Sequence, residues 1–199
     1  MSKDKNIFTL KFILVGKSGA GKTNIINNII NEKFNPANVS TTSFTYVEKE
    51  IKCDNKNYKL EIWDTAGQEK FKSITKIFIA KSKIVLFVYD ITSRKSFEEI
   101  DFWVNSVKEL LGEKPVYGLI GNKNDLYLKE EVKVEEGEKK AEEIKAIFRL
   151  TSAKTGYGIK EIIDDLIKEC DKKIKEGVFE DANEFYKLHN ANKKKKCCG

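Results

Sequence analysis

The sequence has little arginine, little proline and no long hydrophobic run. Only Arg94 and Arg149 of the 37 basic residues are arginine. Proteins that bind nucleic acid usually depend on arginine for bidentate contacts to bases and phosphates, so we expect no nucleic-acid partner. No stretch of about 18 apolar residues occurs, which predicts that no transmembrane helix is present. Residues 1–6 contain no apolar segment and residue 2 is serine, so neither a secretory signal peptide nor N-myristoylation is expected.

Cysteine is also scarce, and the four cysteines show no metal-binding spacing. Cys53 and Cys170 stand alone in the sequence, and each is expected to be a small buried or half-buried apolar residue. Cys197 and Cys198 are adjacent near the C-terminus, where a bridge between neighbours is rare. A reducing cytosol is the expected compartment.

The positive charge is local. The 199 residues have a formal net charge of +6, but four of these charges are the consecutive lysines at 193–196, which leaves +2 for the rest. This distribution indicates a charged tail rather than a basic groove. The length corresponds to one domain with a short tail.

Short apolar runs alternate with helical patterns along the chain. Strands are expected at residues 10–15, 43–52, 58–64, 84–89, 116–120 and 146–150. Helices are expected after residue 23 and at residues 97–111, 135–145 and 159–174, and polar residues 54–57 predict a hairpin turn. The alternation predicts an α/β fold with a mostly parallel six-stranded sheet, one antiparallel edge strand and helices on both faces.

The periodic pattern ends at Lys175. We therefore expect a domain at residues 1–176 and a flexible tail at residues 177–199. The polar segment 177–192 is predicted to be a linker outside the core. A short helix at about 181–188 is the alternative for part of this segment.

A phosphate-binding motif occupies residues 16–23, which read Gly-Lys-Ser-Gly-Ala-Gly-Lys-Thr and match G-x-x-x-x-G-K-[ST]. The glycines allow backbone N–H groups to point at phosphate oxygens, and a helix N-terminus adds a favourable dipole. Lys22 is expected to contact the β- and γ-phosphates, and Thr23 to bind Mg²⁺. The expected phosphate-binding residues are Ser18, Gly19, Gly21, Lys22 and Thr23. A chance match in a glycine-rich loop is the alternative.

A second motif follows the expected strand at 116–120 and reads Asn122-Lys123-Asn124-Asp125. A carboxylate at Asp125 can accept two parallel hydrogen bonds from the N1–H and N2 amine of guanine. Adenine lacks this pair of donors, so such a site rejects it strongly. The predicted base-binding residues here are Asn122, Lys123 and Asp125. A solvated turn is the alternative, but the position after a phosphate-binding motif favours a guanine site.

A third motif, at residues 63–69, reads Trp-Asp-Thr-Ala-Gly-Gln-Glu and ends another expected strand. Asp64 is placed to hold Mg²⁺ through water. Gly67 can donate its backbone N–H to a γ-phosphate, and Gln68 can orient an attacking water. Helix capping by Asp64 is the alternative.

With these motifs in order, the sequence resembles the small GTPases of the Ras superfamily over roughly residues 10–174. The resemblance implies a P-loop NTPase fold, GTP as substrate, GDP as product and Mg²⁺ as cofactor. It further implies that Phe34 contacts the edge of the base and that Thr41 binds Mg²⁺ and the γ-phosphate. It also implies a last base-binding segment, in which the Ala153 N–H meets guanine O6. The residues of that segment are Ser152, Ala153 and Lys154.

Within the superfamily the sequence is most similar to the Rab branch, through Ser18, residues 59–71, residues 88–92 and the C-terminal cysteine pair. This implies that Cys197 and Cys198 are geranylgeranylated. It implies a monomeric switch in vesicle trafficking, on the cytoplasmic face of an intracellular membrane and cycling with the cytosol. The expected partners are an exchange factor, an activating protein, effectors, and a prenyl-dependent escort or dissociation inhibitor.

The partner-facing segments depart from the usual Rab sequence at residues 42–46 and 78–82. The aromatic residues Tyr46, Trp63 and Phe78 persist, so an apolar effector patch is still expected.

Two other functions are open from the sequence. A guanine-nucleotide-binding scaffold with negligible hydrolysis is one, and the presence of Gln68 argues against it. A P-loop nucleotide kinase is the other, but two arginines cannot build its arginine-rich lid. Neither arginine lies in a segment expected to respond to the γ-phosphate. Hydrolysis is therefore expected to be slow until a partner protein supplies an arginine.

Overall fold

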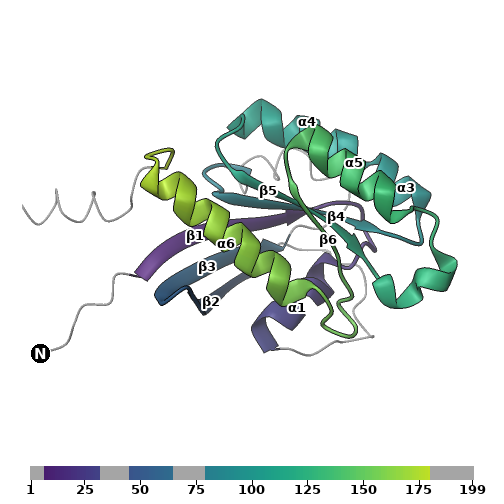
Figure 1. Ribbon diagram of the computed structural model, residues 1–199, viewed down its shortest axis with the longest axis horizontal. Coiled ribbons are helices and arrows are strands. Elements are labelled where there is room, and N and C mark those ends of the chain that lie inside the picture. The colour runs from purple at the N-terminus through teal and green to yellow at the C-terminus, as the bar shows by residue number, and fades with distance from the viewer. Residues whose placement is uncertain (1–6, 32–44, 65–78, 180–199) are drawn as a thin grey trace, which may run out of the picture.

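The computed structural model describes residues 7–31, 45–64 and 79–179 (Figure 1). These residues form a six-stranded sheet of order β2-β3-β1-β4-β5-β6. The parallel strands are β1 (Ile7–Val15), β3 (Lys56–Asp64), β4 (Ile84–Asp90), β5 (Val116–Asn122) and β6 (Ile147–Leu150). Strand β2 (Thr45–Cys53) lies at the edge and pairs antiparallel with β3. The predicted P-loop NTPase fold, with its single antiparallel edge strand, is confirmed.

Helices cover both faces of the sheet, as predicted (Figure 1). They are α1 (Lys22–Asn31), α3 (Arg94–Glu98), α4 (Ile100–Leu111), α5 (Val134–Ile144) and α6 (Ile159–Lys175), with a 3₁₀ helix η2 at Asn124–Lys129. Helices α1 and α6 pack on one face, and α4 and α5 pack on the other. No helix in the described ranges is both long enough and apolar enough to cross a membrane.

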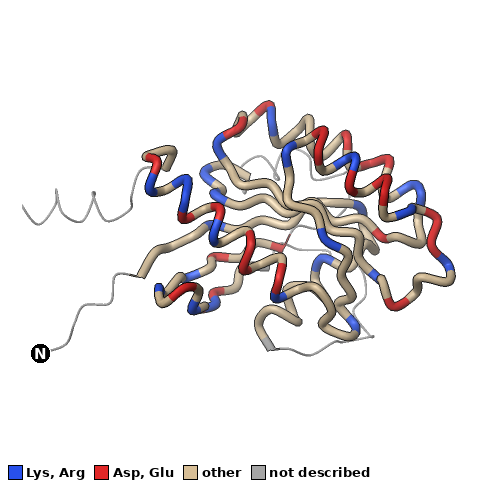
Figure 2. Tube along the Cα trace, viewed as in Figure 1, with Lys and Arg blue, Asp and Glu red and all other residues tan. Residues whose placement is uncertain are grey.

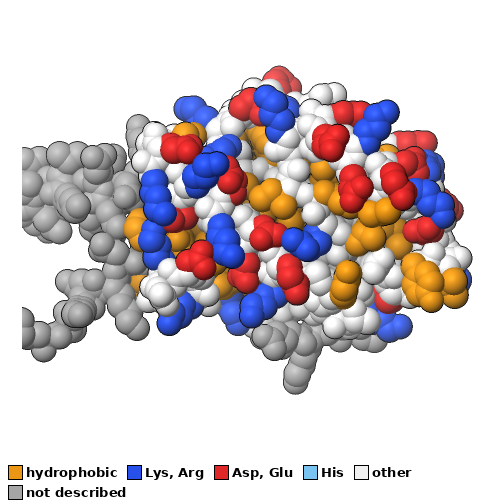
Figure 3. Space-filling model, viewed as in Figure 1, with side chains coloured by type: hydrophobic (Ala, Val, Ile, Leu, Met, Phe, Trp, Pro, Cys, Tyr) orange, Lys and Arg blue, Asp and Glu red, His pale blue; other side chains and the backbone are white. Residues whose placement is uncertain are grey.

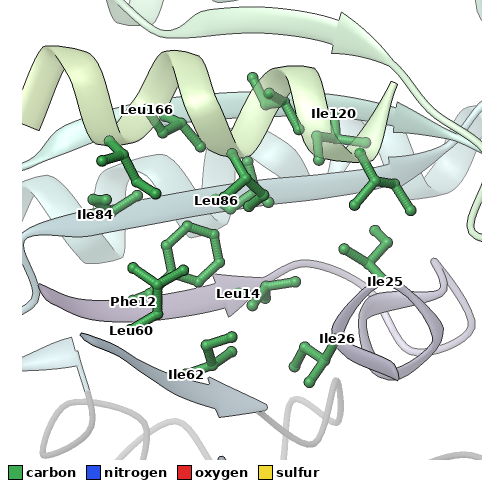
Figure 4. Packing of buried hydrophobic residues seen from close by; sticks show 14 of the residues in the cluster. Phe12, Leu14, Ile25, Ile26, Leu60, Ile62, Ile84, Leu86, Ile120 and Leu166 are labelled. Carbon is green, nitrogen blue, oxygen red and sulfur yellow. The ribbon is translucent and has the colours of Figure 1, made fainter. Parts of the chain in front are cut away.

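The core is two layers that share the central strands. Successive side chains of a strand point to opposite faces, so in β4 Leu86 packs toward α1 and α6 while Phe87 packs toward α4 and α5. Figure 4 shows the first layer, in which Ile25 and Ile26 of α1 and Leu166 of α6 meet the strand residues. Strands buried on both faces explain the near-continuous apolar runs of the sequence.

The helix predicted at 97–111 is two helices. Glu99 separates them with φ −70° and ψ −11°, and its backbone N–H bonds to the carbonyl oxygens of Lys95 and Phe97. The side chain of Ser93 caps the start of α3 by accepting a hydrogen bond from the backbone N–H of Ser96. Glu99 keeps right-handed helical dihedrals, so the three- and four-residue apolar spacing continues through the junction and the sequence pattern does not show it.

The hairpin turn is shorter than predicted. Asp54 and Asn55 alone form it, with φ of 46° and 64°, and Cys53 pairs directly with Lys56. A two-residue hairpin turn of type I′ has positive φ at both positions, which Asp and Asn tolerate. Residues 56 and 57 therefore belong to β3 although they are polar.

The start of the tail also differs from the prediction. Phe179 packs against the core layer of α1 and α6, with Lys83 Nζ 6.0 Å from its ring centre. The chain is turned back there by a hydrogen bond of 2.9 Å from Val178 N to Lys173 O. Residues 180–199, including the alternative helix and both C-terminal cysteines, lie outside the described residues, and the division at 176/177 stays a prediction. Cys53 and Cys170 are both buried, in agreement with the expectation of a buried or half-buried position.

Candidate nucleotide-binding site

The phosphate loop connects β1 to α1 and packs directly on neighbouring strands. Gly16 has φ +147°, and a Cβ atom there would lie 2.1 Å from the carbonyl oxygen of Val88. Gly21 has φ +95°, and its Cβ would lie 2.3 Å from Asn122 Nδ2. Only glycine fits either position, so the backbone of the loop approaches β4 and β5 as closely as the motif requires.

Lys22 begins α1, and its side chain turns back into the loop. Its Nζ donates hydrogen bonds of 2.8 Å to Gly16 O and 3.0 Å to Lys17 O. The residue is only 5% exposed. Burial lowers the pKa of Lys22 to about 8, against the opposing effects of Asp64 and Glu99. The loop therefore surrounds a buried amine that a bound phosphate would favour in its charged form.

Thr23 and Asp64 bring two hard oxygen ligands together. Thr23 Oγ1 donates a hydrogen bond of 2.5 Å to Asp64 Oδ2, and Asp64 ends β3 in a buried position. One hydroxyl and one carboxylate suit Mg²⁺, which usually takes few protein ligands together with phosphate oxygens and water. The described residues contain no group of three or more His, Cys, Asp or Glu side chains suited to a metal. The donor set at Thr23 and Asp64 thus fits the expected ion.

Asn122 joins the phosphate loop to the last base-binding segment. Its Nδ2 donates a hydrogen bond of 2.8 Å to Ala20 O. Its Oδ1 accepts bonds of 3.1 Å from Ala153 N and 3.3 Å from Thr151 Oγ1. The side chain is buried at the end of β5 and lies between two loops, so the structure gives it a supporting position. Direct contact of Asn122 with a nucleotide stays a prediction.

The predicted base-binding residues meet beside Asn122. Ser152 Oγ donates a hydrogen bond of 2.6 Å to Asp125 Oδ1, and Lys154 Nζ lies 4.0 Å from Asp125 Oδ2. A backbone bond of 2.9 Å from Asn124 N to Thr151 O ties the two segments together. The carboxylate of Asp125 is therefore held in one orientation, which a two-point contact to a base requires.

Lys123 has a partner that the sequence did not reveal. Its Nζ forms an ion pair of 2.6 Å with Asp90 Oδ2, while Asp90 Oδ1 accepts bonds from the N–H and hydroxyl of Thr92. Asp90 ends β4, as Asp64 ends β3 and Asn122 ends β5. A polar residue at the carboxyl end of a buried strand was the signal that could have identified Asp90.

All these groups lie at the carboxyl ends of the parallel strands, where ligands of open α/β sheets bind. Four other predicted site residues, Phe34, Thr41, Gly67 and Gln68, lie outside the described residues, and their roles stay predictions.

A family model for the Ras family matches residues 11–172. The match covers well over half of the 199 residues and includes the phosphate loop, Asp64 and both base-binding segments. Ras-family proteins in general bind GTP and GDP with Mg²⁺. This chain belongs to the Ras family and is a small GTP-binding protein.

Proposed function

We propose that this protein is a Rab-type GTPase that hydrolyses GTP to GDP and acts as a membrane-tethered switch in vesicle trafficking. The observation that carries the proposal is the connection made by Asn122. One side chain joins Ala20 of the phosphate loop to Ala153 of the base-binding segment. A protein built in this way holds its phosphate and base contacts at a fixed distance, as recognition of one nucleotide requires.

The chemistry assigned to the site is phosphoryl transfer to water. Thr23 and Asp64 would hold Mg²⁺, which when bound offsets the negative charge of the phosphates. Lys22 contributes a second positive charge, and Gln68 is proposed to orient the attacking water.

The two arginines are engaged by carboxylates on helices. Arg94 donates to Glu136 Oε1 at 2.5 Å, and Arg149 Nη2 donates to Asp165 Oδ2 at 2.6 Å. Neither is therefore available to stabilise charge on the transferred phosphoryl group. Hydrolysis is proposed to be slow alone and to be accelerated by an activating protein that supplies an arginine.

The Rab assignment has support from an aromatic pair in which Tyr46 is exposed and Trp63 is half-buried. The ring centres of Tyr46 and Trp63 are 4.7 Å apart, and Lys11 Nζ lies 5.4 Å from the Trp63 ring centre. Tyr46 is exposed and donates a hydrogen bond of 2.5 Å to Glu48. Tyr46 and Trp63 lie close in sequence to the segments that are proposed to respond to the γ-phosphate, and such a surface suits effectors. Prenylation of Cys197 and Cys198 would place the protein on a cytoplasmic membrane face, from which an escort protein returns it to the cytosol.

Single-turnover hydrolysis tests the proposal. Full-length protein loaded with GTP is expected to release phosphate slowly, while ATP neither binds at micromolar concentration nor is hydrolysed. Gln68→Leu should slow the intrinsic rate with nucleotide affinity nearly unchanged. GTP that stays intact on the wild-type protein, even with a panel of activating proteins, would instead support a non-hydrolysing scaffold.

A further inference from the structure

A groove with a volume of about 590 Å³ lies between α1, β2, α6 and the loop before α6. Its apolar lining consists of four isoleucines, Ile29, Ile51, Ile159 and Ile163. Ile159 and Ile163 are buried, and Ile29 and Ile51 are half-buried. The volume is ordinary for a site that receives a small ligand or a few side chains of a partner.

The rim of the groove has more lysine than carboxylate. The lysines are Lys49, Lys52, Lys154 and Lys160, and the carboxylates are Glu50 and Asp164. Lys49 Nζ donates to the carbonyl oxygen of Ile30 at 2.8 Å. Among the described residues, the only carboxylate within 4.0 Å of these four ammonium groups is Asp125, at 4.0 Å from Lys154 Nζ. Figure 3 shows lysine and acidic side chains interspersed on this side of the molecule. An acidic ligand therefore finds positive groups that are not neutralised by close ion pairs.

One wall of the groove is shared with the base-binding segment. Lys154, Thr155 and Gly156 line it directly. Asn28 of α1 also lines it, and Asn28 Nδ2 donates to Ala153 O at 3.5 Å. A ligand in the groove would thus touch the segment that holds Asp125 in position.

We propose that this groove binds an acidic segment of a partner protein, which inserts a branched aliphatic side chain among the isoleucines, and that binding changes the rate of guanine-nucleotide release. The isoleucine lining selects the aliphatic side chain, and the lysine rim selects the flanking carboxylates. The effect on release rests on the guanine-nucleotide cycle proposed above, whereas binding of the segment does not.

Charge argues against two other occupants. The lysines at 193–196 would be repelled by the lysine rim, and so would a second copy of a chain with a net charge of +6 (Figure 2 shows the charges along the described chain). An anionic bilayer is a flat surface that would reach the lysines but not the recessed isoleucines. A separate acidic polypeptide satisfies both the rim and the lining.

The probe is a capped pentapeptide of sequence Glu-Asp-Leu-Glu-Asp, added to the ¹⁵N-labelled, GDP-bound full chain. We expect chemical-shift changes at Asn28, Ile51, Gly156 and Ile163, with a dissociation constant on the order of 1 mM. A matched peptide with serine in place of leucine is expected to bind at least fivefold more weakly, because it gains nothing from the isoleucines. A peptide with lysine in place of every acidic residue should not bind.

Two double variants test the rim. Lys52→Glu with Lys160→Glu should weaken binding of the leucine peptide at least tenfold. Lys129→Glu with Lys139→Glu makes the same charge change at exposed lysines of η2 and α5, and should change binding less than twofold. At saturation the leucine peptide should alter release of a fluorescent GDP at least twofold, with no effect in the first double variant.

The possible results separate the two parts of the inference. Shifts that map elsewhere, equal binding of leucine and serine peptides, or equal losses in both double variants would overturn the binding site. Peptide that binds at the groove without changing GDP release would overturn the regulatory role. Failure of the full chain to bind GDP would refute the proposed function and leave the peptide mapping as a separate result.

Discussion

Lys17 in the phosphate loop forms an ion pair with Glu99, the residue that separates α3 from α4. The two residues are 82 positions apart in the sequence. Because the carbonyl oxygen of Lys17 also accepts a hydrogen bond of 3.0 Å from Lys22 Nζ, the pair connects the loop around Lys22 to the helices beside β4. Glu99 is thus placed to stabilise the conformation of the phosphate loop.

Glu99→Gln is expected to speed the release of bound GDP by up to about fivefold, since a partly exposed ion pair contributes at most about 1 kcal/mol. Lys17→Gln should have the same effect. The exchange Lys17→Glu with Glu99→Lys should restore slow release, and Glu98→Gln, at an exposed neighbour, should change nothing. Stopped-flow release of a fluorescent GDP measures all four, and an exchange variant as fast as the single variants would contradict the positioning role.

Asp125→Asn is expected to lower guanine-nucleotide affinity by roughly 3–6 kcal/mol, because two charge-assisted hydrogen bonds are lost. Xanthosine diphosphate, which has a carbonyl group at C2, should gain affinity. Ser152→Ala removes the 2.6 Å bond that orients the carboxylate and should cost about 1–3 kcal/mol. Asp101→Asn on α4 is the control for the charge change. Calorimetric titration with GDP and xanthosine diphosphate measures these affinities. Full GDP affinity in Asp125→Asn would show that Asp125 does not recognise the base.

Thr23→Asn is expected to weaken GTP more than GDP, because γ-phosphate binding depends more strongly on the cation. Thr23→Ser keeps the hydroxyl that lies 2.5 Å from Asp64 Oδ2 and should retain most affinity for both nucleotides. Chelation of Mg²⁺ should speed GDP release from wild type more than from Thr23→Asn. Equal losses for GTP and GDP in Thr23→Asn would count against Thr23 as a metal ligand.

GDP affinity is expected to fall as the pH rises above about 8. Burial lowers the pKa of Lys22 in the free protein to about 8. Below that pH Lys22 is already charged, so GDP binding takes up no proton. Bound phosphate raises this pKa, so above pH 8 binding must take up a proton and affinity falls by up to about tenfold per pH unit. Lys22→Arg keeps its charge across this range, and its affinity, though different, should be flat in the same titrations from pH 7 to about 9, below the pH at which the N1–H of guanine ionises. A flat wild-type profile would refute the prediction.

Cys197→Ser with Cys198→Ser is expected to leave the protein in the soluble fraction of cells, with GDP binding unchanged. A single lipid chain gives only reversible membrane binding, so either single substitution should give partial membrane association. Neutralising the four lysines at 193–196 should weaken binding to anionic vesicles, by roughly 1 kcal/mol for each lysine. Double-variant protein that sediments with membranes as wild type does would show that a partner, and not the tail, holds it there.

Local patterns predicted the elements better than their ends. The phosphate loop followed from eight consecutive residues, because its function depends on backbone that only glycine permits at Gly16 and Gly21. The break at Glu99 did not, because apolar spacing continues through it. The length of the hairpin turn was predicted wrongly because Lys56 and Asn57 are polar, as turn residues usually are. Both residues belong to β3.

The residues of the candidate site also fall into two groups, those that a local motif identifies and those that only the fold brings together. The residues suited to phosphate, Mg²⁺ and guanine can be recognised from the sequence alone, since hydroxyl, carboxylate, amine and glycine chemistry is local to each motif. The sequence also indicates the class of the sheet, through the alternation of buried strands with amphipathic helices. Those properties require only short-range patterns.

How the motifs support one another follows from the folded arrangement and not from any one motif. Asn122 bonds to Ala20 and Ala153, Lys123 pairs with Asp90, and Lys17 pairs with Glu99. Ala20 and Ala153 contribute backbone atoms, and the other partners are polar side chains that, considered alone, suit a solvated surface or a strand end equally well. The contacts of Asn122 and Lys123 form because the carboxyl ends of parallel strands, distant in sequence, lie side by side in the sheet. The periodic patterns of the sequence do not show which of these residues lie close together in the fold.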